Sequence, residues 1–262
     1  MKLRGPLSVR TLIIIMVTIV IIGVLVAKSY YGNTNKSIDP RILEARKLYE
    51  QYDVLARTGD YQGIFSLLDS IEGIYEDTDH YKNSFELGVI ENNRAAALLT
   101  IALYRDSIPE FSFPFSELSD DSLVSVAEKH IRRAISLYEA WNASYSGKSS
   151  EELRSMTAAG FREGLEVYDP DQVSAFQETR IDEIEKSILE NHRRLSVCYS
   201  NLGIVYRYQE EYKEAVMQYE KALELWDRNL DAENNLNKLL NHPIKKRNFI
   251  QKLFPPNRDI ND

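Results

Sequence analysis

One stretch near the carboxyl end constrains the fold more than any other: residues 196–229, SVCYSNLGIVYRYQEEYKEAVMQYEKALELWDRN. Apolar residues recur at helical spacing on both sides of Gln209-Glu210-Glu211. This polar connector is too short for anything but an antiparallel reversal of the chain. Gly203, Ala215 and Ala222 have almost no side chain at the positions where two helices must touch. The pattern therefore predicts two amphipathic helices closed into a hairpin.

This hairpin resembles the tetratricopeptide repeat family, which repeats a helical hairpin with a period of about 34 residues. Asp227 stands where the family has a helix-ending proline, so one position departs from the pattern. The resemblance covers about one repeat, and it implies hairpins that stack and present a concave surface to protein partners. The positions that carry it are Tyr199, Leu202, Gly203, Tyr206, Ala215, Tyr219 and Ala222.

Two earlier segments carry weaker versions of the same pattern. The turn Thr58-Gly59-Asp60-Tyr61 interrupts a helical segment that starts at Asp39-Pro40 and runs to about Arg57, and a second helix is expected to about Tyr75. Ile64, Leu68 and Ile71 lie on one face of that helix, so this is either a degenerate repeat or a generic hairpin. Ala127, Ile131 and Ala134 suggest another degenerate copy in a helix over residues 121–141.

Further helices are predicted over residues 81–104 and 150–168, from about Gln172 into the repeat, and over 231–240 as a cover for its open end. Two prolines and three phenylalanines in residues 105–122 predict a loop pinned onto the body. We therefore expect an all-α domain over residues 40–241, built as a stack of antiparallel hairpins, and an irregular tail over 242–262.

The amino terminus predicts a membrane anchor. Residues 11–27, TLIIIMVTIVIIGVLVA, carry no charge, and Lys2, Arg4 and Arg10 precede them. A helix of this length spans roughly 25 Å, at the short end for a bilayer. A secretory signal peptide is the alternative, since Ala27-Lys28-Ser29 could be its cleavage site.

We expect an uncleaved transmembrane helix over residues 11–28, with residues 1–10 in the cytoplasm and a linker over 29–39. The helical domain would then lie outside, on the periplasmic side of the inner membrane if the source is bacterial.

Charge and motif content narrow the function classes. The net charge is −8, and every acidic residue follows Lys28, which disfavours nucleic acid as a partner. The four histidines are scattered, and the sequence holds no phosphate-binding loop and no nucleophile elbow. Asp77, Asp79 and His80 could bind a metal, but they fall at a predicted helix end, where capping is the commoner role. We expect no enzyme, no metal and no cofactor.

These features predict a membrane-anchored module that binds proteins, as an accessory or scaffold subunit in bacterial envelope assembly or secretion. Two alternatives stay open: a self-associating, homo-oligomeric spacer in a membrane complex, and a soluble secreted domain. In the repeat, Leu202 and Gly203 are expected to face the second helix. The groove that would receive the partner is predicted to expose Ser200, Asn201, Ile204, Arg207 and Tyr208.

Overall fold

The computed structural model describes residues 37–108, 115–248 and 251. The predicted anchor over residues 11–28, the segment before it and nearly all of the predicted linker lie outside these residues. Within the described residues every regular element is a helix, so the all-α prediction is confirmed there. None of the helices in this part of the chain has the length and apolarity needed to cross a bilayer.

The described part of the chain alternates long helices with short turns. The α-helices are α2 (Leu43–Tyr49), α3 (Tyr52–Thr58), α4 (Tyr61–Asp77), α5 (Phe85–Tyr104), α6 (Asp120–Tyr145), α7 (Ser150–Thr157), α8 (Pro170–Tyr208), α9 (Tyr212–Leu225) and α10 (Leu230–Leu239). The 3-10 turns are η1 (Pro40–Ile42), η2 (Asp79–Tyr81), η3 (Arg105–Ser107) and η5 (Ala158–Phe161).

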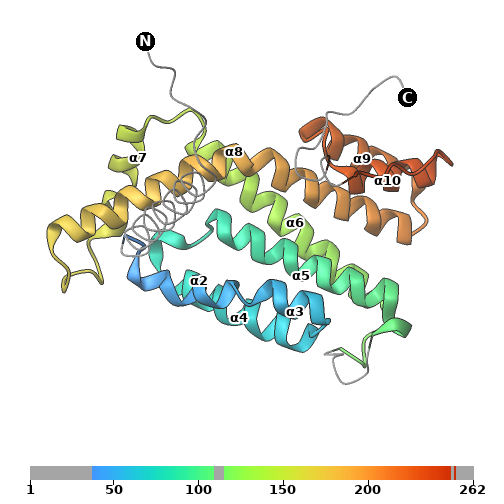
Figure 1. Cartoon of the computed structure of the whole chain (residues 1–262), viewed down its shortest axis with the longest axis horizontal. Helices are drawn as coiled ribbons and strands as arrows, with labels where there is room; N and C mark the ends of the chain where they lie inside the picture. The colour runs from blue at the N-terminus through green and yellow to red at the C-terminus, as the bar shows by residue number, and fades with distance from the viewer. Residues whose placement is uncertain (1–36, 109–114, 249–250, 252–262) are drawn as a thin grey trace, which may run out of the picture.

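The helices pack as a series of antiparallel neighbours. Helices α2 to α4 form one layer, α5 and α6 lie side by side next to it, and α8 runs along α6 (Figure 1). Helices α9 and α10 pack at one end of α8, and α7 packs nearer its other end (Figure 1). Helix α8 therefore contacts both the layer of α5 and α6 and the pair of α9 and α10.

Local sequence explains where the helices begin and end. Gly59 ends α3 in the left-handed conformation at φ 68°, and the Asp60 carboxylate then caps α4 by accepting from the Gly63 amide. Asp169 caps α8, whose first residue is the proline expected at such a position. The sequence patterns that predicted a turn at 58–61 and a long helix running into the repeat are confirmed.

Several predicted boundaries were wrong. The first helical segment is split into η1, α2 and α3. The helix predicted over 81–104 starts only at Phe85, because Asn83 adopts φ 56° and breaks the helical path. The helix predicted over 150–168 ends at Thr157, and η5 follows it. Helix α6 continues past Trp141 to Tyr145.

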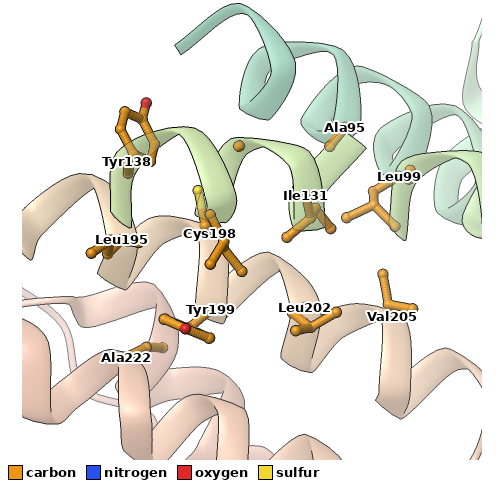
Figure 2. Close-up of a cluster of buried hydrophobic side chains, with 14 of the residues drawn as sticks. Ala95, Leu99, Ile131, Tyr138, Leu195, Cys198, Tyr199, Leu202, Val205 and Ala222 are labelled. Carbon is orange, nitrogen blue, oxygen red and sulfur yellow. The ribbon is translucent and has the colours of Figure 1, made fainter. Parts of the chain in front are cut away.

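The core lies between α5, α6 and α8, and it continues to α9. Figure 2 shows Leu195, Cys198 and Val205 of α8 among side chains of α5 and α6, with Ala222 of α9 on the other side of Tyr199. The residues of the weaker patterns are all buried, in agreement with their predicted inward face. They are Ile64, Leu68 and Ile71 on α4, and Ala127, Ile131 and Ala134 on α6.

Candidate protein-interaction groove

The hairpin of α8 and α9 is closed by a glycine that lies under a tyrosine ring. A Cβ atom on Gly203 would come within 2.5 Å of Cε1 of Tyr219, so no larger residue fits without moving that ring. Tyr219 is fully buried, and burial raises the pKa of its hydroxyl to about 12. The predicted contact of Gly203 with the second helix is present.

Neutral polar groups fix α9 and α10 to the same hairpin. The Ser196 hydroxyl donates to the Ala222 carbonyl oxygen at 2.6 Å, and Asn229 Nδ2 donates to Ser196 Oγ at 2.9 Å. Asn229 Oδ1 also accepts from the Ala232 amide and so caps α10. One buried asparagine therefore links the end of the repeat to the helix that covers it.

A groove opens where α5, α8 and α10 meet. Its volume is about 330 Å³, and its apolar part includes Leu99 and Leu103 of α5 and Ile204 of α8. Asn235 and Lys238 of α10 form the other side. Tyr104 lines the groove with 61% of its surface exposed, which leaves an aromatic ring open to a partner.

Four of the five residues predicted for the groove line it: Ser200, Asn201, Ile204 and Arg207. Arg207 Nη1 donates to Asn235 Oδ1 at 3.4 Å, and Asn201 Nδ2 donates to Asn92 Oδ1 at 3.0 Å. Ser200 is only 4% exposed, so it lies deep in the structure and not at the surface where it was expected.

Tyr208 lies outside the groove. Its hydroxyl donates to Asp121 Oδ1 of α6 at 2.9 Å, and this hydrogen bond raises the pKa of the Tyr208 hydroxyl. The predicted pairing of Tyr208 with Arg207 failed because adjacent residues on a helix point about 100° apart. Arg207 therefore faces α10, whereas Tyr208 faces α6.

The groove also contains residues that the sequence did not single out. Asn235 of α10 lines it and accepts a hydrogen bond from Arg207. Asn92 of α5 is not part of the lining, but it supports it by accepting hydrogen bonds from both Asn201 and the Cys198 thiol. Asparagine carries both donors and acceptors, so it can bind backbone amides of an extended segment. Only the helical spacing of Asp231 and Asn235 could have indicated that they share a face with Lys238.

The metal-type cluster noted in the sequence is dispersed in the fold. Asp79 is exposed and pairs with Lys82, whereas the His80 ring packs against Phe161 at 5.2 Å between ring centroids. Burial lowers the pKa of His80 to about 4. Across the described residues, no group of three or more His, Cys, Asp or Glu side chains is placed to hold a metal ion.

An antiparallel helical hairpin with a glycine–tyrosine contact and a covering third helix defines a helical-repeat unit. The family model described as tetratricopeptide repeat matches residues 181–228, which include α8 from Ile181 to its end and all of α9. This segment is a tetratricopeptide repeat, as the sequence predicted. Searches of curated proteins and of solved structures each found no match to the chain.

Proposed function

We propose that this protein is a membrane-anchored adaptor that holds a protein partner in the groove between α5, α8 and α10. The tetratricopeptide repeat itself indicates a protein–protein interaction module. The observation that carries the proposal is the groove, where an exposed tyrosine and apolar side chains meet amide side chains from α8 and α10. Aromatic and arginine side chains dominate the energetics of many protein interfaces.

The chemistry of the groove favours an extended peptide segment with mixed apolar and polar side chains. Leu99, Leu103 and Ile204 can bury an apolar side chain, while Asn201 and Asn235 can bind its backbone. Arg207 and Lys238 outnumber Asp231 by one, so the groove carries only a small positive charge and does not select for a strongly charged partner. This small charge and the net charge of −8 weigh against nucleic acid.

The anchor remains part of the proposal and rests on the apolar run of residues 11–27. It would hold the helical domain, over residues 40–241, outside the cytoplasmic membrane. There the groove could recruit a subunit of an envelope assembly or secretion complex. That setting rests on analogy with other anchored repeat proteins and not on a contact in this fold.

Site-specific photo-crosslinking in native membranes tests the proposal. A photoreactive residue at Asn235, inside the groove, should capture a partner that mass spectrometry can identify. The same residue at Lys213, exposed on α9 and outside the groove lining, is the matched control and should not capture it. Equal capture at both positions would remove the groove from the proposal, and capture of a second copy would indicate the self-associating spacer instead.

A further inference from the structure

A larger cavity lies between α2, α4, α5 and α8. Its volume is about 870 Å³, and none of its described lining residues belongs to α9 or α10. Much of its wall is aliphatic, with Leu43, Ile71, Val89 and Ile90 facing it from three helices. Pockets that bind small organic molecules typically have volumes of roughly 300–1,000 Å³ and a largely apolar lining, so this cavity lies within that range.

Two of the three carboxylates among the described lining residues are paired with arginine. Glu86 pairs with Arg180, and Glu183 pairs with Arg46. Burial alone would raise the pKa of Glu86, but Arg180 outweighs burial and holds that pKa below its usual value. Glu86 is therefore ionised at neutral pH, and both glutamates already have an arginine partner, so neither is free to receive a cationic ligand.

Arg194, which is partly buried, differs from Arg46 and Arg180 of the same region. It lines the cavity, and among the described residues it has no carboxylate within ion-pair distance. The Nε donors of Arg194 and Arg46 are also buried, and no described residue supplies an acceptor. A buried donor without an acceptor costs about 1–3 kcal/mol, and more when it is charged. The cavity therefore presents cationic donors that lack an anionic acceptor.

One unpaired guanidinium selects for a single negative charge. The second charge of a dianion such as a phosphate monoester would find no cation of its own in the described lining, because Arg46 is already paired with Glu183. A peptide would bring amide groups against the aliphatic part of the wall, where Leu43, Val89 and Ile90 offer no hydrogen-bonding partner. Those amides would lose water without gaining partners, at a cost of roughly 1–3 kcal/mol each. The matching ligand has one carboxylate and an otherwise apolar body.

We propose that this cavity binds a long-chain monocarboxylate, with its carboxylate on Arg194 and its hydrocarbon chain along Leu43, Val89 and Ile90. Guanidinium and carboxylate groups form charge-assisted, often bidentate hydrogen bonds, which gain strength in a low-dielectric site. The aliphatic wall supplies the hydrophobic part of the affinity. Lys47 and Glu50 also line the cavity. Both are exposed, and their opposite charges add nothing to the net charge of the lining.

Photolabelling of the full chain in lipid nanodiscs tests this assignment. The probe is dodecanoate with a diazirine on its chain, and mass spectrometry locates the labelled residues. We expect saturable labelling of α2 and α5 peptides. Unlabelled dodecanoate should protect at a concentration at least tenfold lower than dodecanamide, which has the same apolar body without the charge. Labelling that does not saturate, or equal protection by the two competitors, would overturn the proposal.

Two neighbouring arginines of α8 provide the matched variants. Arg194→Gln should weaken protection by dodecanoate at least tenfold and leave protection by dodecanamide unchanged. Arg193→Gln is the control, because Arg193 pairs with Glu190 and lies over the Trp226 ring instead. The same loss in both variants would contradict the assignment. If Arg194→Gln does not fold, as judged by circular dichroism, the acid–amide comparison in the unaltered protein decides the question.

A final competitor separates the two sources of an apolar carboxylate. Acetyl-Leu-Leu with a free carboxyl group should protect at least tenfold more weakly than dodecanoate. Stronger protection by this peptide would overturn the assignment in favour of a polypeptide carboxyl terminus. Crosslinking at Asn235 tests the groove, and photolabelling with the dodecanoate probe tests the cavity. Either experiment can therefore fail without affecting the other.

Discussion

The α5–α6 and α8–α9 hairpins contain the same glycine–tyrosine contact, but the two residues are separated by different distances along the sequence. In each, a Leu-Gly pair on the first helix lets a tyrosine ring of the second helix lie against the glycine. A Cβ atom on Gly88 would be 2.7 Å from Cε1 of Tyr138, and one on Gly203 would be 2.5 Å from Cε1 of Tyr219. Both rings are almost fully buried. The two hairpins therefore solve the same packing problem in the same way.

The difference lies in the connection. Three residues join α8 to α9, so Tyr219 follows Gly203 closely and the repeat frame is intact. A long segment that includes Pro109 and Pro114 joins α5 to α6, which places Tyr138 far from Gly88 in sequence. A contact between helices depends on their facing surfaces, whereas a sequence pattern depends on spacing. The match to the family model, over residues 181–228, falls on the second hairpin.

The leucines of the two Leu-Gly pairs give the largest expected effect. Leu87 and Leu202 are both buried, so Leu87→Ala and Leu202→Ala should each lower the free energy of unfolding by ~2–5 kcal/mol. Leu189→Ala on α8 is the control, since Leu189 is 83% exposed and should matter by less than ~0.5 kcal/mol. Chemical denaturation measures all three. A large loss for only one leucine would show that the hairpins are not equivalent.

Acid should act on the layer before α5 more than on the repeat contact. The folded protein holds the pKa of His80 at about 4, below its ordinary value of 6.5, because the ring is buried. As pH falls from 6.5 to 4, the unfolded state takes a proton that the folded state refuses, so stability decreases by at most about 3 kcal/mol. His80→Gln should flatten this slope in denaturation measured across that pH range. His192→Gln, an exposed control on α8, should leave it unchanged.

The two glycines test whether the shared contact is equally tight. Gly88→Leu and Gly203→Leu should each cost ~1–3 kcal/mol or more, because the added side chain displaces a buried ring. Gly73→Leu on α4 is the control: no atom lies within 4 Å of its Cβ position, and leucine favours a helix more than glycine does. We expect a lower melting temperature for the first two and an equal or higher one for the third.

Groove residues should affect binding without affecting stability. Arg207→Ala and Asn235→Ala should change the free energy of unfolding by about 0.5 kcal/mol or less, since both side chains are only partly buried. Arg207→Ala should in addition reduce capture of a partner by the photoreactive residue at position 235. Tyr208→Phe is the control, because it removes the hydrogen bond to Asp121 outside the groove. Loss of capture by Tyr208→Phe alone would move the interface to the α6 side.

Sequence patterns predicted what depends on local spacing. The small and apolar positions Ile64, Ala127 and Gly203 were expected on inward faces, and the structure buries or packs all three. The ion pair of Glu86 with Arg180 joins residues far apart in the chain, so no periodicity could reveal it. Arg180 is 1% exposed, and its guanidinium lies 4.3 Å from the centroid of the Tyr81 ring. Its burial depends on tertiary packing alone.

The end of α7 shows a similar limit. The pattern to about Tyr168 indicated a continuing helix, but a Cβ atom on Gly160 would be 2.7 Å from Cβ of His80. The chain makes this close approach in η5, where Phe161 packs on the His80 ring. Beside the groove, the same limit applies to Asn92, because its hydrogen bond from Asn201 follows from the position of α5 beside α8. Four groove positions could be predicted from the repeat frame, and Asn92 could not.

Helix α8 contributes side chains to both the large cavity and the groove, and because it is continuous it fixes the angle between these two surfaces about its axis. Arg194 faces the large cavity and Ile204 faces the groove, and they are ten residues, or roughly 15 Å, apart along one helix. Each residue inserted between them would turn one surface by about 100° relative to the other. An insertion of seven residues would nearly restore the phase while lengthening the helix. The number of residues between Arg194 and Ile204 therefore fixes how the groove is oriented relative to the large cavity.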